Sequence, residues 1–206
     1  AVVGGSAGAV SVTGVLGGVL NNTSKSLRTL TLVNSAGANF TQAVVADDSV
    51  VLSDTTGTIT FANNLTTPKL VTAAKPYNLE LLGASTQITA TGGSASTAFI
   101  NTGYLTLGND STDQLLFAGG LSATAPSAVN AAGVISTTGT AMTLGDSDTA
   151  LTLTQNVSLA TSGGALSING AVYGALANTQ SLSLDAGSAV VGGSAGAVSV
   201  LSLIHI

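Results

Sequence analysis

The chain has 206 residues and a formal net charge of −5, and only 6% of its residues are charged and 3% aromatic. With four Lys and Arg in total it cannot build the basic surface that nucleic acids or anionic membranes require, so we expect neither as a partner. The absence of Cys excludes a disulfide framework and a thiolate metal site. This composition favours a coil of many similar layers over one globular core.

The sequence repeats its own beginning. Residues Ala1–Val12, AVVGGSAGAVSV, recur without change at Ala189–Val200, so that position 189 is equivalent to position 1. A fixed long period is typical of repeat proteins. We therefore interpret residues 1–200 as a single segment that holds one full repeat and the start of the next. Neighbouring repeats of the same chain are then its first expected partners.

Short alternating runs recur along the chain, and a period of two predicts strands with one buried face. Clusters of Gly, Asn, Asp and Ser lie between the runs and predict turns. The ten clearest runs are Leu30–Leu32, Ile59–Phe61, Leu79–Leu81, Leu105–Leu107, Leu115–Phe117, Leu151–Leu153, Val157–Leu159, Leu166–Ile168, Leu182–Leu184 and Val198–Val200. Convincing helical periodicity is absent, so we predict an all-β fold.

Two all-β architectures fit the spacing of these runs. A right-handed parallel β-helix of roughly ten rungs, each of about 20 residues, is the favoured one. It explains why hairpin signals are sparse, why the buried positions are small and aliphatic, and why Asn and Thr recur at turns. A tandem β-sandwich is the alternative. Residues Ser122–Thr140 contain Pro126 and few large apolar side chains, and we predict a looser loop or a poorly formed rung there.

Ala1–Leu20 is uncharged, but its glycines and its recurrence at position 189 argue against a membrane span, and it lacks the basic region of a signal peptide. The final residues, LSLIHI at 201–206, depart from the repeat and resemble a translated sequencing adapter. We interpret them as a non-native tail, which removes His205, the one histidine.

Several phrases resemble those of large bacterial β-strand-repeat proteins, similar to filamentous-haemagglutinin-type adhesins and autotransporter passenger domains. The phrases are residues 27–32 (LRTLTL), 50–61 (VVLSDTTGTITF), 163–170 (GGALSING) and 177–187 (ANTQSLSLDAG). The resemblance implies a right-handed parallel β-helix, secretion to the bacterial cell surface across the outer membrane, and a role in adhesion, biofilm or surface coating. Host or matrix glycans and proteins would be the partners. It carries over no catalytic residue and no cofactor.

The best candidate for catalysis is the pair Asp146 and Asp148. If this stretch is extended, both carboxylates point to one face, as an acid and a base of a polysaccharide hydrolase or lyase would. The alternative is a solvated turn that caps the following strand, Leu151–Leu153. Sites of that kind usually add Arg, Lys, His or aromatic sugar platforms, which are scarce here. We therefore favour a structural or adhesive segment without catalysis, with the carbohydrate-active enzyme as the alternative.

Two acidic loops offer hard oxygen ligands for calcium: Asn109, Asp110 and Asp113 in one, Asp146 and Asp148 in the other. Neither follows a known calcium-loop pattern, and turn formation explains both. Without a natural His, a Ser-His-Asp triad is excluded. We therefore expect no catalytic, metal or cofactor site in this segment.

Overall fold

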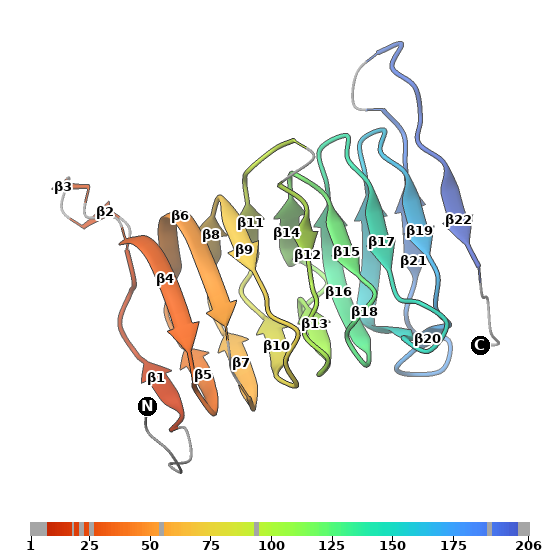
Figure 1. Cartoon of the computed structure of the whole chain (residues 1–206). Coiled ribbons are helices and arrows are strands. Elements are labelled where there is room, and N and C mark those ends of the chain that lie inside the picture. Colours follow the sequence, from red (N-terminus) through yellow and green to blue (C-terminus); the bar gives the residue numbers. More distant parts are fainter. Residues whose placement is uncertain are drawn as a thin grey trace.

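The computed structural model describes residues 8–17, 19–20, 23–24, 27–53, 56–92, 95–188 and 191–201. Within these ranges the chain forms strands and no helix, and the strands stack in parallel as a β-solenoid of about seven turns (Figure 1). The predicted all-β solenoid is confirmed, and the tandem sandwich is not what forms. No helix long and apolar enough to cross a membrane occurs among these residues.

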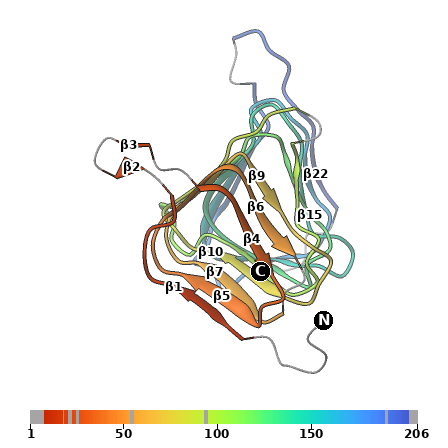
Figure 2. The same ribbon diagram turned by 60° about the vertical axis from the view of Figure 1, so that its left-hand side comes forward.

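Three faces enclose the core, and each turn of the chain passes them in the same order (Figure 2). The first face holds β1 (Val10–Val12), β5 (Gly37–Phe40), β7 (Thr58–Phe61), β10 (Asn78–Leu81), β13 (Leu105–Leu107), the starts of β16 (Val129–Ser136) and β18 (Leu151–Ala160), and β20 (Val172–Gly174). The second face holds the start of β6 (Val44–Ser53), β8 (Leu65–Thr67), β11 (Ser85–Ile88), β14 (Gln114–Phe117), the ends of β16 and β18, and β21 (Leu182–Asp185).

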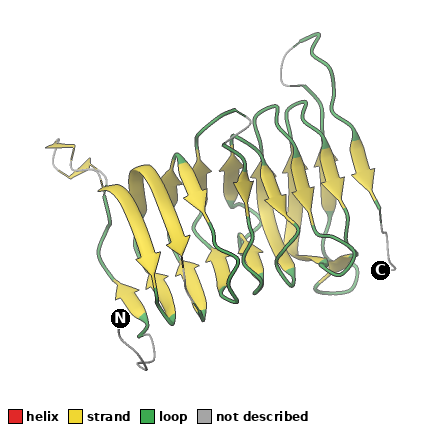
Figure 3. Ribbon diagram, in the orientation of Figure 1, coloured by secondary structure: helices red, strands yellow, loops and turns green. Residues whose placement is uncertain are grey.

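The third face completes each turn. It holds β4 (Leu27–Val33), the end of β6, β9 (Lys69–Val71), β12 (Thr97–Ala98), β15 (Leu121–Ala123), β17 (Met142–Leu144), β19 (Leu166–Ile168) and β22 (Val198–Val200). A short antiparallel hairpin of β2 (Val19–Leu20) and β3 (Thr23–Ser24) projects beside the first turn. Figure 3 shows loops joining the strands of successive faces. All ten alternating runs predicted from the sequence lie in strands.

The core consists of rows in which each inward side chain stacks on its equivalent one turn away. One row on the first face runs through Phe40, Phe61, Leu81, Leu107, Ala131 and Leu153, paired in register from strand to strand. The rings of Phe40 and Phe61 stack with their centroids 4.8 Å apart. Because each row is continuous, hydrophobic burial is spread evenly along the axis and no single centre dominates.

The predicted number of rungs is too high: the coil has about seven turns where roughly ten were expected. One turn on the first face runs from Ile59 to its partner Leu79, but the next runs from Leu79 to Leu105 and uses a clearly longer stretch of chain. The difference lies in the loops between faces, which vary in length from turn to turn while the strands remain in register. A spacing derived from strand cores alone therefore underestimates the length of chain in each turn.

The prediction of a loose stretch at 122–140 is also wrong. Strand β16 is eight residues long, pairs with strands on both sides and buries Val129, Ala131 and Ile135 completely. The small alanine at position 131 fits because the neighbouring turns supply leucines. Gly133, at φ +77°, forms the corner where β16 passes from the first face to the second. A Cβ there would overlap the Asp113 carbonyl oxygen, so the corner requires glycine.

Buried threonines satisfy the backbone at the corners between the second and third faces. The Thr137 hydroxyl donates to the Thr140 carbonyl oxygen at 2.6 Å, and one turn later the Thr161 hydroxyl donates to the Gly164 carbonyl oxygen at 2.5 Å. Both threonines are almost fully buried. A buried carbonyl without a partner costs stability, so these hydroxyls allow sharp corners inside a dry core.

Candidate functional site

The sequence candidate Asp146-Ser147-Asp148 lies between β17 and β18 and forms a bend, so the extended conformation that a catalytic pair would need does not occur. The Asp146 Oδ1 atom accepts hydrogen bonds from the backbone N–H of Asp148 at 3.2 Å and of Thr149 at 2.9 Å. Behind the bend, the buried Thr149 hydroxyl donates to the Pro126 carbonyl oxygen at 2.7 Å. Asp146 therefore holds the turn that leads into β18, as the alternative interpretation predicted.

The two carboxyl groups also contact each other. A side-chain hydrogen bond with Asp148, reinforced by the hydrogen bonds from Thr149, lowers the pKa of Asp146. The same hydrogen bond with Asp146, reinforced by the charge of Asp146, raises the pKa of Asp148. The two carboxyl groups therefore titrate as a pair, in which Asp146 loses its proton more readily and Asp148 less readily than an isolated aspartate.

This contact limits what the pair can do in catalysis. Glycoside hydrolysis places a sugar bond or a water molecule between two carboxyl groups that lie at least ~5 Å apart. Asp146 and Asp148 instead bond directly to each other, and Asp146 is also occupied by two backbone N–H groups. The bend thus has the geometry of a structural turn.

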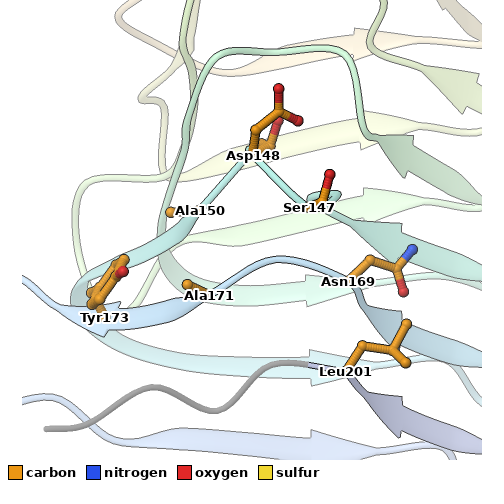
Figure 4. A pocket seen from close by; sticks show the side chains of 8 residues that line it. Ser147, Asp148, Ala150, Asn169, Ala171, Tyr173 and Leu201 are labelled. Atoms are coloured by element: carbon orange, nitrogen blue, oxygen red, sulfur yellow. The ribbon is translucent and has the colours of Figure 1, made fainter.

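A shallow groove of about 470 Å³ opens beside Asp148. Figure 4 shows Asp148 and Ser147 on the bend, Tyr173 of β20 at one end and Asn169 and Leu201 at the other. The Tyr173 side chain is 41% exposed. A ring, an amide, a carboxyl group and hydroxyls are the side chains that bind sugars and other polar ligands. Leu201 belongs to the expected non-native tail.

Sequence reasoning did not identify Tyr173 as a groove residue. It is distant from Asp148 in the sequence and reaches the groove because β20 pairs with β18 one turn away. The available signal was its position, since Tyr173 faces outward next to the inward Val172 in a short alternating run. The sequence does not show which turn of the coil lies next to Tyr173, because this depends on the loop lengths.

The second acidic loop is closed by its own hydrogen bonds. The Asp113 Oδ2 atom accepts from the backbone N–H of Asn109 at 2.8 Å and of Asp110 at 3.0 Å. The Asp110 Oδ1 atom accepts from the backbone and the hydroxyl of Thr112, which lowers the pKa of Asp110. These oxygens serve the turn between β13 and β14. Across the described residues, no group of three or more His, Cys, Asp or Glu side chains is placed to hold a metal ion.

A polar network that the sequence did not predict lies on the outside of the first face. The Glu80 carboxylate accepts from the Thr60 hydroxyl at 2.8 Å and from the Tyr104 hydroxyl at 2.7 Å. The hydrogen bond to Glu80 is the main reason why the pKa of Tyr104 is raised. Asn78 accepts from the Tyr104 backbone N–H and donates to the Thr58 hydroxyl. The network ties three successive turns together, which is a structural role.

No basic side chain among the described residues lines the groove. Lys25 lies outside the described residues, as do residues 202–206 with His205. Arg28 and Lys69 lie on β4 and β9 of the third face, toward the other end of the coil. The ionisable groups of the groove are therefore the Asp148 carboxyl and the Tyr173 hydroxyl.

The Asp146→Ala variant tests the coupling between the two carboxyl groups. We expect the pKa of Asp148 to fall toward the ordinary aspartate range, because its hydrogen-bond acceptor and the neighbouring charge are both removed. In the parent chain the raised pKa of Asp148 adds stability at low pH that is lost as the pH rises through it. The lowered pKa of Asp146 adds stability at higher pH that is lost as the pH falls through it.

Carboxyl-carbon NMR titration of the chain measures both groups. Asp110 serves as the internal control, since its pKa depends on Thr112 and should not move. An unchanged Asp148 titration in Asp146→Ala would show that the two carboxyl groups are not coupled.

Comparisons with known proteins identify no relative for this chain. No protein-family model matches it, and neither the search of curated proteins nor the search of solved structures gave a match. The fold and the groove must therefore be interpreted from their own chemistry.

Proposed function

We propose that this chain is a structural and adhesive segment, without catalysis, of a large secreted or cell-surface bacterial repeat protein. The observation that carries the proposal is the chemistry of the two end turns. Within the described residues, each end turn presents strand edges and apolar side chains of the same kind as those buried between the inner turns. Such surfaces are suited to being covered by further turns of the same coil.

The apolar side chains at the two ends match in kind. At the first turn Val12, Leu16 and Leu30 pack against the core but are only partly buried. At the last turn Val172 and Leu184 do the same on the first and second faces, while Val198 on the third face is 48% exposed. Among the described residues, each end therefore presents a three-sided apolar ring rather than a polar cap.

The adhesive part of the proposal rests on the outer surface and on the resemblance to filamentous-haemagglutinin-type adhesins. Strand positions that point outward carry mainly Ser, Thr and Asn, which bind polar surfaces through hydroxyl and amide groups. The groove between Asp148 and Tyr173 is one place for such a contact. Host or matrix glycans and proteins are the proposed partners, beside neighbouring repeats, with no nucleic acid, membrane insertion or cofactor.

A polysaccharide hydrolase or lyase is the second candidate, because the pKa of Asp148 is raised and Asp148 lines a groove beside an exposed Tyr ring. A protonated carboxyl group beside a sugar platform is the arrangement of a general acid. Against it stands Asp146, the nearest carboxylate, which is hydrogen-bonded to the turn and to Asp148.

Binding and turnover on a panel of immobilised polysaccharides separate the two candidates. We expect the chain to be retained on at least one polysaccharide without releasing sugars, and Tyr173→Ala to weaken retention by about tenfold, or ~1.4 kcal/mol. Thr106→Ala, an outward change on the same face several turns away, is the matched control and should bind normally. Sugar release that disappears in both Asp146→Ala and Asp148→Ala would establish the enzyme instead. Retention on no polysaccharide of the panel would contradict glycan adhesion.

A further inference from the structure

The Val-Ser-Val strand that ends the repeated dodecapeptide lies on two different faces of the coil. Near the start of the chain, β1 lies on the first face and pairs with β5, with Ser11 opposite Asn39. Near the end, the identical Val-Ser-Val of β22 lies on the third face and pairs with β19, with Ser199 opposite Ser167. The same peptide thus returns, one sequence period later, at a different angle around the axis.

The angle follows from the strand order. From β1 to β20 the chain makes seven full turns on the first face, and it then passes the second face at β21 and reaches the third at β22. One period of the sequence therefore corresponds to seven and two-thirds turns of the coil. Because the period is not a whole number of turns, the next repeat begins at a different angle around the axis.

The backbone hydrogen bonds of the two copies are complementary. In the first copy the carbonyl oxygens of Gly8 and Val12 accept from the next turn, at 3.1 Å from the nitrogens of Ala36 and Thr41. In the second copy the carbonyl oxygen before β22 and the N–H after it bond to β19 of the preceding turn. These groups belong to Ala197 and Leu201, which correspond to positions 9 and 13 of the repeat. Successive residues of a strand point their backbone groups to opposite sides, so positions 9 and 13 bond to one neighbour while Gly8 and Val12 bond to the other. One strand can therefore satisfy both neighbours at once, as an inner strand of a parallel sheet does.

We propose that successive repeats of residues 1–188 continue one coil, with the Val-Ser-Val strand shared at each junction, and that each repeat is rotated by two-thirds of a turn relative to the one before. This inference rests on the proposed repeat protein and specifies how its repeats join. At the junction, the equivalent of Leu16 covers Val172 on the first face, and the equivalent of Leu30 covers Leu184 on the second. The apolar rings of the two end turns then close on each other.

The rotation has a consequence for binding. The groove of Asp148 and Tyr173 lies on one side of the coil in one repeat, and the following two repeats present it on the other two sides. Three repeats return it to its starting face. A fibre built in this way carries the groove on all three of its sides. It can therefore contact a surface whatever its rotation about the fibre axis.

A tandem chain of two copies tests the junction, because the sequence contains no Cys and pairs can be introduced freely. One pair combines Ser167→Cys of the first copy with Ser11→Cys of the second, and the competing pair combines Tyr173→Cys of the first copy with Ser11→Cys of the second. The control pair, Thr143→Cys with Ser167→Cys, lies in register inside one copy. Neighbouring strands are ~4.8 Å apart, which is close enough for a disulfide.

On mild oxidation we expect the Ser167 pair to cross-link as completely as the control pair, and the Tyr173 pair to cross-link at least tenfold less. Cross-linking of the Tyr173 pair alone would place the second copy in phase with the first. That result would overturn the rotation and leave the continuous repeat coil intact. Cross-linking of neither pair, with the control intact, would overturn both the rotation and the continuous coil.

Discussion

The Phe61→Ala variant should lose about 3–5 kcal/mol of its free energy of unfolding. Phe61 is buried on the first face, stacks on Phe40 from the preceding turn and lies in register with Leu81 of the next turn. Removing the ring leaves a cavity between two turns that the backbone cannot close, because strand pairing fixes the spacing of the turns. Urea denaturation followed by far-UV circular dichroism measures the loss.

Phe61→Leu is the matched control. The same row holds Leu81, Leu107 and Leu153 in later turns, so a leucine side chain fits this position without new strain. We expect a loss of about 1–1.5 kcal/mol. If the Ala and Leu variants unfolded at the same urea concentration, Phe61 would not be packed between turns as described.

The Gly164→Ala variant should destabilise the coil by about 3 kcal/mol, at the upper end of the cost of overpacking. A Cβ on Gly164 would overlap the backbone oxygen and carbon of Thr140 and lie 2.8 Å from its nitrogen. Thr140 belongs to the preceding turn, and its carbonyl oxygen accepts the Thr137 hydroxyl. The two turns would have to separate at a corner that both use. Thermal unfolding and urea denaturation both measure the effect.

Gly14→Ala is the control for the general effect of removing a glycine. Its Cβ would meet no atom within 4 Å, and the variant should change the free energy of unfolding by less than about 1 kcal/mol. The contrast between the two variants isolates the contact between turns. Equal stability of Gly164→Ala and the parent chain would contradict the close approach of Gly164 to Thr140.

Strand positions could be predicted because each strand carries its own signal. Leu79-Glu80-Leu81 alternates in the sequence and alternates in burial, with Glu80 outward. Position 131 shows the limit, because an alanine gives no apolar signal by itself. Its burial depends on Leu107 and Leu153, which lie in other turns. A stretch with few large apolar side chains can therefore still form a well-packed strand when the neighbouring turns provide the large side chains of the core.

The number of turns and the face of each strand could not be predicted for a related reason. Both depend on the loop lengths and on which strands pair. Loop lengths and strand pairing produce no periodic pattern in the sequence. Strand β6 shows this, since its ten residues pass from the second face to the third as one continuous strand, although Asp47 and Asp48 lie where the face changes. The identity of β1 and β22 suggested equivalent places, yet they lie on different faces.

The candidate site was partly predictable. Asp146 and Asp148 are close in sequence, so their proximity was certain and their use as a turn was one of the two interpretations. The groove beside them needed Tyr173 and Asn169, which reach it through strand pairing in the following turn. The opposite pKa shifts of the two carboxyl groups depend on the bend that brings them together, and a sequence pattern does not fix that bend.

Small-angle X-ray scattering of chains with one, two and three copies of residues 1–188 tests whether this segment is a length of continuous coil. With seven and two-thirds turns per copy and ~4.8 Å per turn, each copy should lengthen the rod by about 37 Å while its cross-section stays constant. A growing cross-section, or separate compact bodies joined by flexible linkers, would contradict the continuous coil.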